Sequence, residues 1–254
     1  MQQNQLPDMT ATAPRVFLIR HGETEWSRRE LHTGSTDVPL TEKGEHQVKS
    51  TGITCIGDGK LIDPARIARI YVSPRSRALQ TVKLLDLGVN DRLPWDSSLS
   101  DTRLPASSRK NNASIEISED LREWNYGDYE GKSVAEVWKK RQAKDLDTES
   151  RPWNIFQDGC EGGESPAQVT KRLDGFISKL MDDLKKSENR AGGFERSDIV
   201  CVAHGHILSA LATRWTGRSL EDGMRLLIDT AGIAVLSFEH HALDEPAIVI
   251  GPKS

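Results

Sequence analysis

Two histidines in this sequence stand directly after short apolar runs and directly before a glycine. His21 follows Val16-Phe-Leu-Ile-Arg20, and His204 follows Asp198-Ile-Val-Cys-Val-Ala203. Apolar runs of this length without alternation are typical of strands that are buried on both faces of a central sheet. Open α/β sheets bind ligands at the carboxyl ends of such strands, so these positions favour chemistry over packing. Gly22 permits an unusual backbone turn just past the first strand.

Two arginines accompany these histidines. Arg20 precedes His21, and Arg77 lies in a helix that we expect after the strand Ile67–Val72, opened by Ser73-Pro74. A guanidinium binds phosphate through two parallel charge-assisted hydrogen bonds and stays charged throughout the working pH range. The same positive field disfavours the protonated form of His21, which leaves a neutral imidazole nitrogen able to attack phosphorus. Together these residues predict a pocket for a small phosphate.

Cleavage of a phosphate ester also needs a proton for the departing alkoxide. The segment Asp120-Leu-Arg-Glu-Trp-Asn-Tyr-Gly-Asp-Tyr-Glu-Gly131 offers carboxylates in a turn-rich, aromatic setting, where partial burial can raise the pKa of a carboxyl group. Glu123 is our choice for this acid. Residue types alone leave three other carboxylates open as alternatives, namely Asp120, Asp128 and Glu130.

Composition limits the class of protein. The chain has 254 residues, 36% of them hydrophobic, which suits one large core. Its net charge of −4 provides no general attraction for nucleic acid or an anionic membrane, and we expect neither as a partner. Three cysteines without CxxC spacing, Cys55, Cys160 and Cys201, indicate reduced thiols in a cytoplasmic protein. No apolar stretch is long enough to span a bilayer.

The periodic segments predict an α/β fold, a three-layer α/β/α sandwich with a central, mostly parallel sheet and helices on both faces. Thr41 can cap one helix, and a long helix from Pro166 to about Lys186 carries apolar residues at helical spacing. Near the end of the chain, Ile233–Phe238 and Ala247–Ile250 are expected strands with a hairpin connection.

The domain organisation follows from what lies outside these elements. We expect residues 1–13 to be a flexible tail and residues 14–254 to form a single domain, with a small cap inserted at about 87–160. Within that insertion, residues 97–114 are rich in Ser, Asn and Arg and lack periodicity, which favours an exposed loop.

Four segments, in this order, resemble the signature blocks of the histidine phosphatase superfamily, also called phosphoglycerate-mutase-like. They are Arg20-His-Gly-Glu-Thr24, Ser73-Pro-Arg-Ser-Arg-Ala78, Leu121-Arg-Glu-Trp-Asn-Tyr-Gly127 and Ala203-His-Gly-His206. The likeness extends from about Val16 to Gly251 and implies that His21 is a phosphorylated nucleophile and Glu123 the acid and base. It also implies phosphate-binding residues, which are Arg20, Arg77 and His204, with further polar contacts from Ser27 and Thr33.

Three other segments look closest to fungal sedoheptulose-1,7-bisphosphatases. They are Arg122-Glu-Trp-Asn-Tyr-Gly-Asp-Tyr-Glu-Gly131, Arg151-Pro-Trp-Asn-Ile-Phe-Gln-Asp-Gly-Cys-Glu161 and Ala231-Gly-Ile-Ala-Val-Leu-Ser-Phe-Glu-His-His241. Phosphoglycerate mutases characteristically carry an arginine after the catalytic glutamate, where this chain has Trp124. The resemblance therefore implies a phosphatase for a small sugar phosphate, such as sedoheptulose-1,7-bisphosphate or a related sugar (bis)phosphate. The alternatives are mutase-type phosphoryl transfer and a non-catalytic phosphate-binding regulatory protein.

No cofactor or metal is expected, because the arginines supply the positive charge that Mg²⁺ would otherwise provide. His204 and His206 could form a metal pair, but the sequence shows no clear third ligand for them. Trp124 and His206 are candidates for the substrate pocket. Core packing is the competing role for Trp124, and a bond to a backbone group is the competing role for His206. Assembly into a homo-oligomer is left open.

Overall fold

The computed structural model describes residues 13–89, 93–95, 111–188, 197–222 and 225–251, so residues 1–12 and most of the run 97–114 lie outside it. The strands are β1 (Val16–Arg20), β2 (Ile67–Val72), β3 (Ser114–Ile117), β4 (Asp198–Ala203), β5 (Ile233–Phe238) and β6 (Pro246–Val249). The α-helices are α1 (Glu25–Arg28), α2 (Glu42–Cys55), α3 (Ser76–Leu85), α4 (Val134–Gln142), α5 (Ile155–Asp158), α6 (Pro166–Glu188) and α7 (Gly205–Trp215). Short 3-10 helices are η1 (Pro64–Arg66), η2 (Glu119–Leu121), η3 (Gly127–Tyr129), η5 (Leu220–Asp222) and η6 (Glu239–His241).

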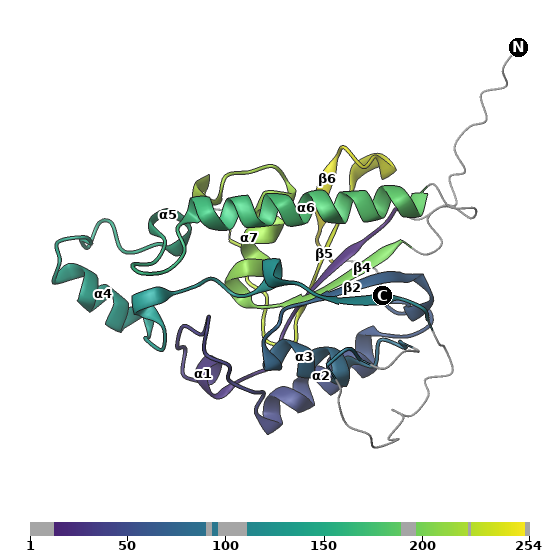
Figure 1. Cartoon of the computed structure of the whole chain (residues 1–254), viewed down its shortest axis with the longest axis horizontal. Coiled ribbons are helices and arrows are strands. Elements are labelled where there is room, and N and C mark those ends of the chain that lie inside the picture. The colour runs from purple at the N-terminus through teal and green to yellow at the C-terminus, as the bar shows by residue number, and fades with distance from the viewer. Residues whose placement is uncertain (1–12, 90–92, 96–110, 189–196, 223–224, 252–254) are drawn as a thin grey trace, which may run out of the picture.

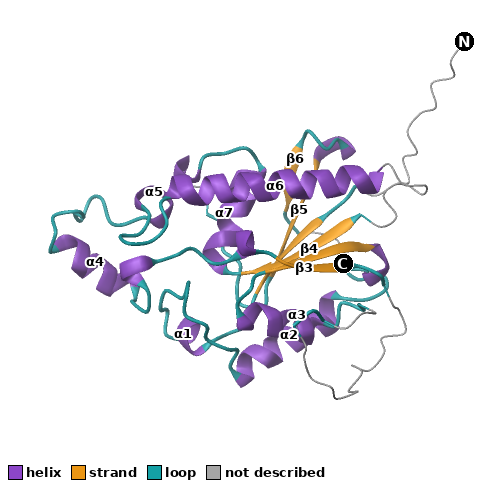
Figure 2. Ribbon diagram, in the orientation of Figure 1, coloured by secondary structure: helices purple, strands orange, loops and turns teal. Residues whose placement is uncertain are grey.

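One sheet with the strand order β3-β2-β4-β1-β5-β6 forms the middle layer. β3, β2, β4 and β1 pair in parallel, whereas β5 runs antiparallel to both β1 and β6. Helices α6 and α7 cover one face of the sheet, and α2 and α3 cover the other (Figure 1). The predicted α/β sandwich with a mostly parallel sheet is therefore confirmed, and Figure 2 shows its strands between the two helical layers.

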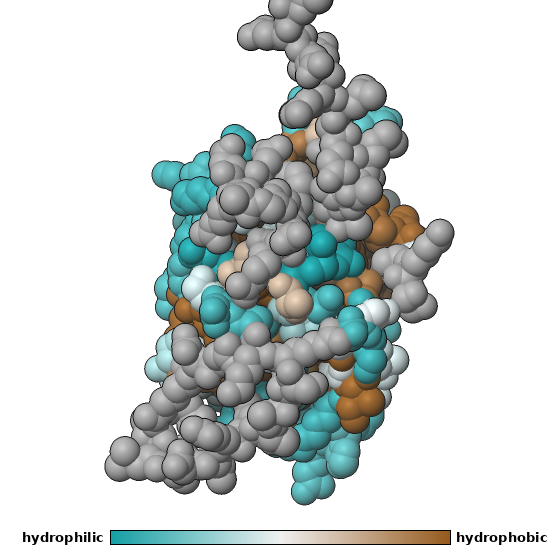
Figure 3. Space-filling model, turned by 90° about the vertical axis from the view of Figure 1, so that its right-hand side faces the viewer, coloured by the Kyte–Doolittle hydropathy of each residue, from teal (hydrophilic) through white to brown (hydrophobic). Residues whose placement is uncertain are grey.

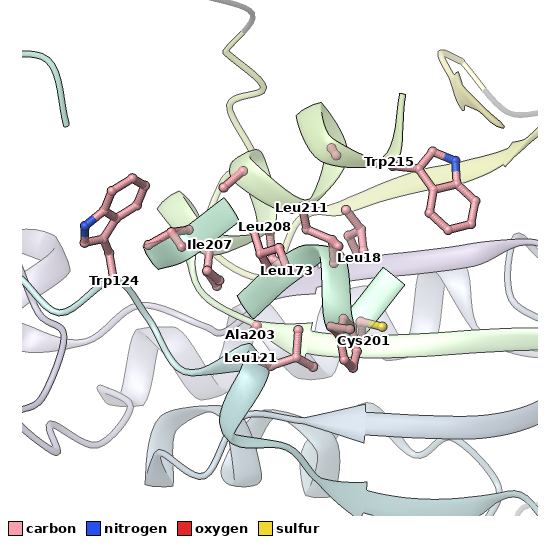
Figure 4. Close-up of a cluster of buried hydrophobic side chains, with 14 of the residues drawn as sticks. Leu18, Leu121, Trp124, Leu173, Cys201, Ala203, Ile207, Leu208, Leu211 and Trp215 are labelled. Atoms are coloured by element: carbon pink, nitrogen blue, oxygen red, sulfur yellow. The ribbon is translucent and has the colours of Figure 1, made fainter. Parts of the chain in front are cut away.

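Both faces of the central strands are sealed by apolar side chains. Along β1, Val16 and Leu18 belong to the cluster under α6 and α7, while Phe17 and Ile19 belong to the cluster under α2 and α3. Because successive side chains of a strand point to opposite faces, a continuous apolar run is what a doubly covered strand requires. Figure 4 shows the first cluster, which extends from Trp124 at one end to Trp215 at the other.

The expected cap at 87–160 contains one element of the sheet. β3 pairs in parallel with β2 and is the edge strand, so the part of this segment that leaves the sheet begins after Ile117. The sequence did not reveal β3, because only four residues form it and two of them, Ser114 and Glu116, are polar. Beyond it, α4 stands away from the sheet at one end of the molecule (Figure 1).

The start of α3 also differs from the expectation. Ser73-Pro74 does not open the helix, which begins at Ser76. The cap comes from a distant segment, since the carboxylate of Asp37 accepts hydrogen bonds from the backbone N–H and the hydroxyl of Ser76 at 2.8 and 2.9 Å. α2 follows the local rule instead, because the side chain of Thr41 accepts from Gly44 N at 3.0 Å.

On the face shown in Figure 3, hydrophobic residues of the described part form separate small groups between hydrophilic ones. No helix among the described residues is long and apolar enough to cross a membrane. All three cysteines are free thiols in the structure, and Cys201 is fully buried in β4. The cytoplasmic location stays a prediction.

Candidate active site

The pairing of β1 with β4 brings the two histidines together. Arg20 is opposite Ala203 in the sheet register, and His21 N donates to Ala203 O at 3.0 Å. The residues that follow the two strands are therefore neighbours, and the rings of His21 and His204 lie edge to face with centroids 5.1 Å apart. Both side chains are buried, with 5% and 1% of their surface exposed. The convergence expected from the sequence is a consequence of this register.

Gly22 is required for a reason other than the expected turn. Its backbone does not adopt positive φ, but a Cβ at this position would lie 2.5 Å from the carbonyl oxygen of Gly44. The chain after β1 thus passes against the first turn of α2, and any side chain at Gly22 would push the two apart.

Gly22→Ala is expected to lower the free energy of unfolding by about 1–3 kcal/mol, because the nearest group is the backbone carbonyl of Gly44, which cannot rotate away, and the next is the buried side chain of Val48. Gly175→Ala is the matched control, since nothing lies within 4 Å of a Cβ there and alanine favours a helix by up to about 1 kcal/mol. Urea unfolding followed by circular dichroism measures both. Equal stability of the two variants would contradict this account of Gly22.

The imidazole of His21 is held in a single orientation. Nδ1 lies 2.7 Å from the carbonyl oxygen of Gly22, and since a carbonyl only accepts, Nδ1 carries the proton. The other nitrogen, Nε2, then presents its lone pair. Burial lowers the pKa of His21 well below its ordinary value, and the charges of Arg77 and Arg20 lower it further, although the bond to Gly22 opposes this. A neutral, oriented imidazole is the form that can act as a nucleophile.

The guanidinium of Arg77 is fully buried and spans several segments of the site. Its Nη1 and Nη2 donate to the carbonyls of Thr36 and Thr33 at 3.1 and 3.0 Å, and its Nε donates to His204 Nδ1 at 3.1 Å. It is one of the few charged side chains among the described residues with no exposed surface. Among the described residues no carboxylate forms an ion pair with Arg77, and a buried positive charge of this kind favours an anionic ligand nearby.

Arg20 has unused hydrogen-bonding capacity. Its Nη1 donates to Ile228 O at 2.9 Å, while its buried Nε has no partner in the part of the chain that the structure describes. The guanidinium lies against Gly205, where an added Cβ would be 3.3 Å from its central carbon. An unsatisfied buried donor is costly, and binding of an anion would remove this cost.

His204 is neutral in this arrangement. Arginine can only donate, so Nδ1 of His204 accepts from Arg77 Nε, and Nε2 is left to donate to the hydroxyl of Ser73 at 2.7 Å. Burial and the nearby positive charges lower the pKa of His204 well below its ordinary value. Both ring nitrogens are thus occupied, and because Nε2–H is the donor of this ring, a phosphate oxygen could bind it only by replacing the hydroxyl of Ser73.

Glu123 lies with its carboxylate at the N-terminus of α7. Oε1 accepts from the backbone N–H groups of Trp124 and Ile207, both at 2.9 Å, and Oε2 accepts from His206 N at 3.1 Å. The side chain is 6% exposed. Burial raises the pKa of Glu123 above its ordinary value, although the three backbone donors and Arg77 act in the opposite direction. A buried carboxyl with a raised pKa can hold a proton for a leaving group.

Two of the three alternatives to Glu123 have carboxylates that are engaged by structural partners. The carboxylate of Asp128 is exposed and pairs with Lys140 at 2.9 Å. The carboxylate of Glu130 accepts from Gly34 N and Thr36 N, which fixes the loop that follows His32. Asp120 is half-buried in η2. The structure therefore favours Glu123 through its burial and its position at α7.

Two residues that the sequence did not indicate hold the Glu123 segment in place. The carboxylate of Glu164 accepts from Asn125 N at 2.9 Å and pairs with Arg172 at 2.8 Å. Arg172 in turn donates to the carbonyls of Asp120 and Arg122 at 2.7 and 2.9 Å. Their positions before and within α6 gave no local sign of this role, since the contact joins segments about 40 residues apart.

Three residues that the sequence indicated as ligand-binding candidates form hydrogen bonds within the protein instead. Trp124 is fully buried in the core, and its indole donates to Glu164 O at 2.9 Å, which agrees with the competing role in core packing. Ser27 N and the side chain of Ser27 form a capping box with Thr24 at the start of α1. The hydroxyl of Thr33 donates to Leu31 O at 3.0 Å. For the last two, contact with a phosphate stays a prediction that requires these bonds to be exchanged.

His206 lies beside Glu123 in an aromatic cluster that the sequence did not reveal. Its Nδ1 is 2.6 Å from the phenol oxygen of Tyr126, and its ring stacks on that of His32 with centroids 6.2 Å apart. Burial lowers the pKa of His206 to about 3, so the ring is neutral. His32 and Tyr126 come from other parts of the chain, and His32 carried no motif that could have marked it. Among the described residues, no group of three or more His, Cys, Asp or Glu side chains is arranged to hold a metal ion.

Comparison with known proteins establishes the class that this fold and site define. Residues 16–104 and 91–245 match the model of the histidine phosphatase superfamily (branch 1), and the chain belongs to this family. It is 36% identical to sedoheptulose 1,7-bisphosphatase of Saccharomyces cerevisiae, over 96% of this chain and 95% of that protein. It is 34% identical to an acid phosphatase of Mycobacterium tuberculosis, over 89% and 87% of the two chains. These relatives class the chain with the phosphoric monoester hydrolases.

A solved structure supports the same conclusion about the fold. The product of an open reading frame from M. tuberculosis superimposes with a TM-score of 0.66 at 28% sequence identity, covering 93% of this chain and 96% of that one. The resemblance inferred from the four sequence blocks is therefore confirmed at the level of the family.

Proposed function

We propose that this protein removes phosphate from a small sugar phosphate through a phosphohistidine at His21. The observation that carries the proposal is the orientation of His21, whose Nδ1 is committed to Gly22 O so that Nε2 has a free lone pair beside two guanidiniums. The likeness to the yeast sedoheptulose 1,7-bisphosphatase makes sedoheptulose-1,7-bisphosphate the first candidate substrate. Related sugar bisphosphates are the next candidates.

The first step forms a bond between His21 Nε2 and phosphorus while the bond to the sugar oxygen breaks. Arg20 and Arg77 bind the phosphate oxygens and stabilise the charge of the in-line transition state. Glu123 gives its proton to the departing sugar oxygen, so the alcohol leaves neutral. For His204 to contribute, its Nε2–H must leave the hydroxyl of Ser73 for a phosphate oxygen, while Nδ1 continues to accept from Arg77 Nε.

The second step returns the enzyme to its starting state. Glu123, now a carboxylate, takes a proton from water as the water oxygen attacks the phosphohistidine. The bond between phosphorus and Nε2 breaks, inorganic phosphate leaves, and Glu123 is again protonated. Positive charge for both steps comes from the two arginines, so the proposed mechanism has no requirement for Mg²⁺.

A mutase would use the same phosphohistidine but return the phosphate to a sugar acid. At Trp124, where mutases carry an arginine for the substrate, this chain places a fully buried indole that contributes no charge to the site. This residue favours the phosphatase over the mutase. Efficient interconversion of 2- and 3-phosphoglycerate in the presence of a bisphosphoglycerate primer, with little free phosphate, would instead support the mutase.

Purified protein is expected to release phosphate from sugar bisphosphates at the same rate with and without EDTA. The panel contains sedoheptulose-1,7-bisphosphate, fructose-1,6-bisphosphate, fructose-2,6-bisphosphate and several sugar monophosphates, and kcat/KM is measured for each by phosphate release. The highest kcat/KM is expected for the seven-carbon bisphosphate. No release from any member would support the non-catalytic alternative, and a strict need for Mg²⁺ would contradict the proposed mechanism.

A further inference from the structure

Two stacked imidazoles next to Glu123 each have one nitrogen without a protein partner. His32 Nδ1 lies 2.6 Å from Lys132 O, and His206 Nδ1 lies 2.6 Å from the phenol of Tyr126. The two rings are nearly parallel, with an interplanar angle of 10°. In the part of the chain that the structure describes, neither Nε2 atom has a hydrogen-bond partner, so both are free to bind a ligand.

These nitrogens are open to a ligand and not sealed in the core. The fully buried side-chain atoms without a partner, among the described residues, are one nitrogen each of Arg20 and Arg66 and one oxygen of Asp147. Neither imidazole contributes to that set. His206 N also donates to Glu123 Oε2 at 3.1 Å, which places the pair beside the group proposed to protonate the leaving sugar.

Both rings are neutral, which suits contact with hydroxyl groups. His32 Nδ1 faces a carbonyl and carries the proton, so its Nε2 accepts. If Tyr126 donates to His206 Nδ1, then Nε2 of that ring donates. Burial lowers the pKa of both histidines, so neither becomes charged at neutral pH. One acceptor next to one donor matches a sugar carbon chain, whose hydroxyls both donate and accept.

An arginine lies at the edge of this pair. Leu226 N donates to the hydroxyl of Ser209 at 3.1 Å, and Ser209 is three residues after His206 on α7, hence on the same face. Arg225 directly precedes Leu226, and its charge is near enough to His206 to be among those that lower the pKa of that ring. Arg225 is exposed and pairs with no carboxylate of the described residues.

The loop that carries Arg225 is fixed to the catalytic strand. Ile228 O accepts from Arg20 Nη1 at 2.9 Å, and Ala231 N donates to His21 O at 3.1 Å. The guanidinium of Arg225 therefore extends from a backbone that is anchored on both α7 and β1. These contacts fix the backbone of the loop, and the exposed side chain of Arg225 extends from it.

We infer that His32, His206 and Arg225 form a subsite for the leaving group, in which the two imidazoles bind sugar hydroxyls and Arg225 binds a second phosphate. The inference rests on the proposed function for the nature of the ligand. In this subsite, one exposed arginine outside the catalytic core makes the protein bind a sugar bisphosphate more tightly than a monophosphate. Solvent screens this charge, so we expect about tenfold in affinity from it.

Binding to the full-length His21→Ala protein tests the subsite without turnover. Isothermal titration calorimetry measures the affinity for sedoheptulose-1,7-bisphosphate relative to sedoheptulose-7-phosphate. Adding Arg225→Gln is expected to reduce this ratio about tenfold. Arg218→Gln is the matched control, because Arg218 is an exposed arginine beyond the other end of α7, and it should leave the ratio unchanged. Equal ratios in the two double variants would overturn the role of Arg225.

His32→Phe tests the imidazole pair in the same background. The ring packing on Tyr126 and Trp153 at 4.8 and 5.3 Å is retained, while both nitrogens are removed. Affinity for sedoheptulose-7-phosphate relative to inorganic phosphate is expected to fall about fivefold. An unchanged ratio would refute hydroxyl binding by His32. Neither measurement involves catalysis, so both test the subsite even if the wild-type protein releases no phosphate. Absence of phosphate release would contradict the proposed function.

Discussion

His21→Ala is expected to reduce kcat for sugar phosphate hydrolysis by about 10⁴-fold or more, because the proposed nucleophile is removed and water must attack phosphorus directly. The side chain is buried at the end of β1, and its loss leaves a space next to His204 without disturbing the sheet register. Phosphate release at saturating substrate measures the effect. Circular dichroism checks that the variant is folded.

His240→Ala is the matched control for this experiment. The side chain of His240 is 80% exposed and pairs with Glu245 at 2.7 Å in η6, which follows the end of β5 that points away from His21. Its replacement should leave kcat unchanged. Wild-type protein quenched in alkali during turnover of ³²P-labelled substrate should carry label on the chain, and the His21→Ala protein should carry none. Label or normal turnover in that variant would refute the assignment of His21.

Glu123→Gln is expected to lower kcat for sugar phosphates by about 10²–10⁴-fold, since a poor alkoxide leaving group then departs without a proton. An activated ester such as p-nitrophenyl phosphate needs no such proton in the first step. With this substrate, the variant should release a burst of nitrophenol equal to the enzyme and then stall, because water attack still lacks its base. Stopped-flow absorbance measures the burst.

The matched control is Glu119→Gln, an exposed glutamate four residues earlier whose carboxylate makes no bond to the site. It should change neither the burst nor the steady rate. A Glu123→Gln protein that turned over sugar phosphates at the wild-type rate would remove Glu123 from the mechanism. If the burst is absent, circular dichroism shows whether the variant has lost its fold or only its activity.

The pH profile of the wild-type enzyme follows from the two buried groups. Burial raises the pKa of Glu123, and the proposed acid must be protonated, so activity is expected to fall as pH rises through that pKa. Burial and the arginines lower the pKa of His21, and the nucleophile must be neutral, so activity is lost at acidic pH only below that lowered pKa. In Glu123→Gln, the loss at high pH should disappear from the first step, since no carboxyl group remains to titrate there.

Local sequence was sufficient where one short segment sets the structure. The apolar run Val16–Ile19 became β1, Ile67–Val72 became β2, and Thr41 caps α2 as expected. The long helix begins at Pro166, and its apolar spacing matches the buried face of α6. Each of these features depends on a periodicity or a cap within a few residues, so a single sequence contains the signal.

Contacts between distant segments were not predictable in this way. Gly22 is fixed by the backbone of Gly44, the cap of α3 comes from Asp37, and Trp124 is buried by its packing and by Glu164. Residue type at one position does not reveal which other segment will lie against it. β3 was missed for the same reason, because a four-residue edge strand gains its stability from pairing with β2.

The sequence by itself determined the chemistry available to this protein: a histidine and an arginine at the end of a buried strand, a second histidine after another strand, and a glutamate in a turn. Only the tertiary structure decided how these groups are used. The register of β1 and β4 makes His21 and His204 neighbours, and burial next to Arg77 makes both neutral. The physical reason is that pKa and hydrogen-bond direction depend on solvent exclusion and on partners brought by folding, whereas residue identity fixes only which groups can respond.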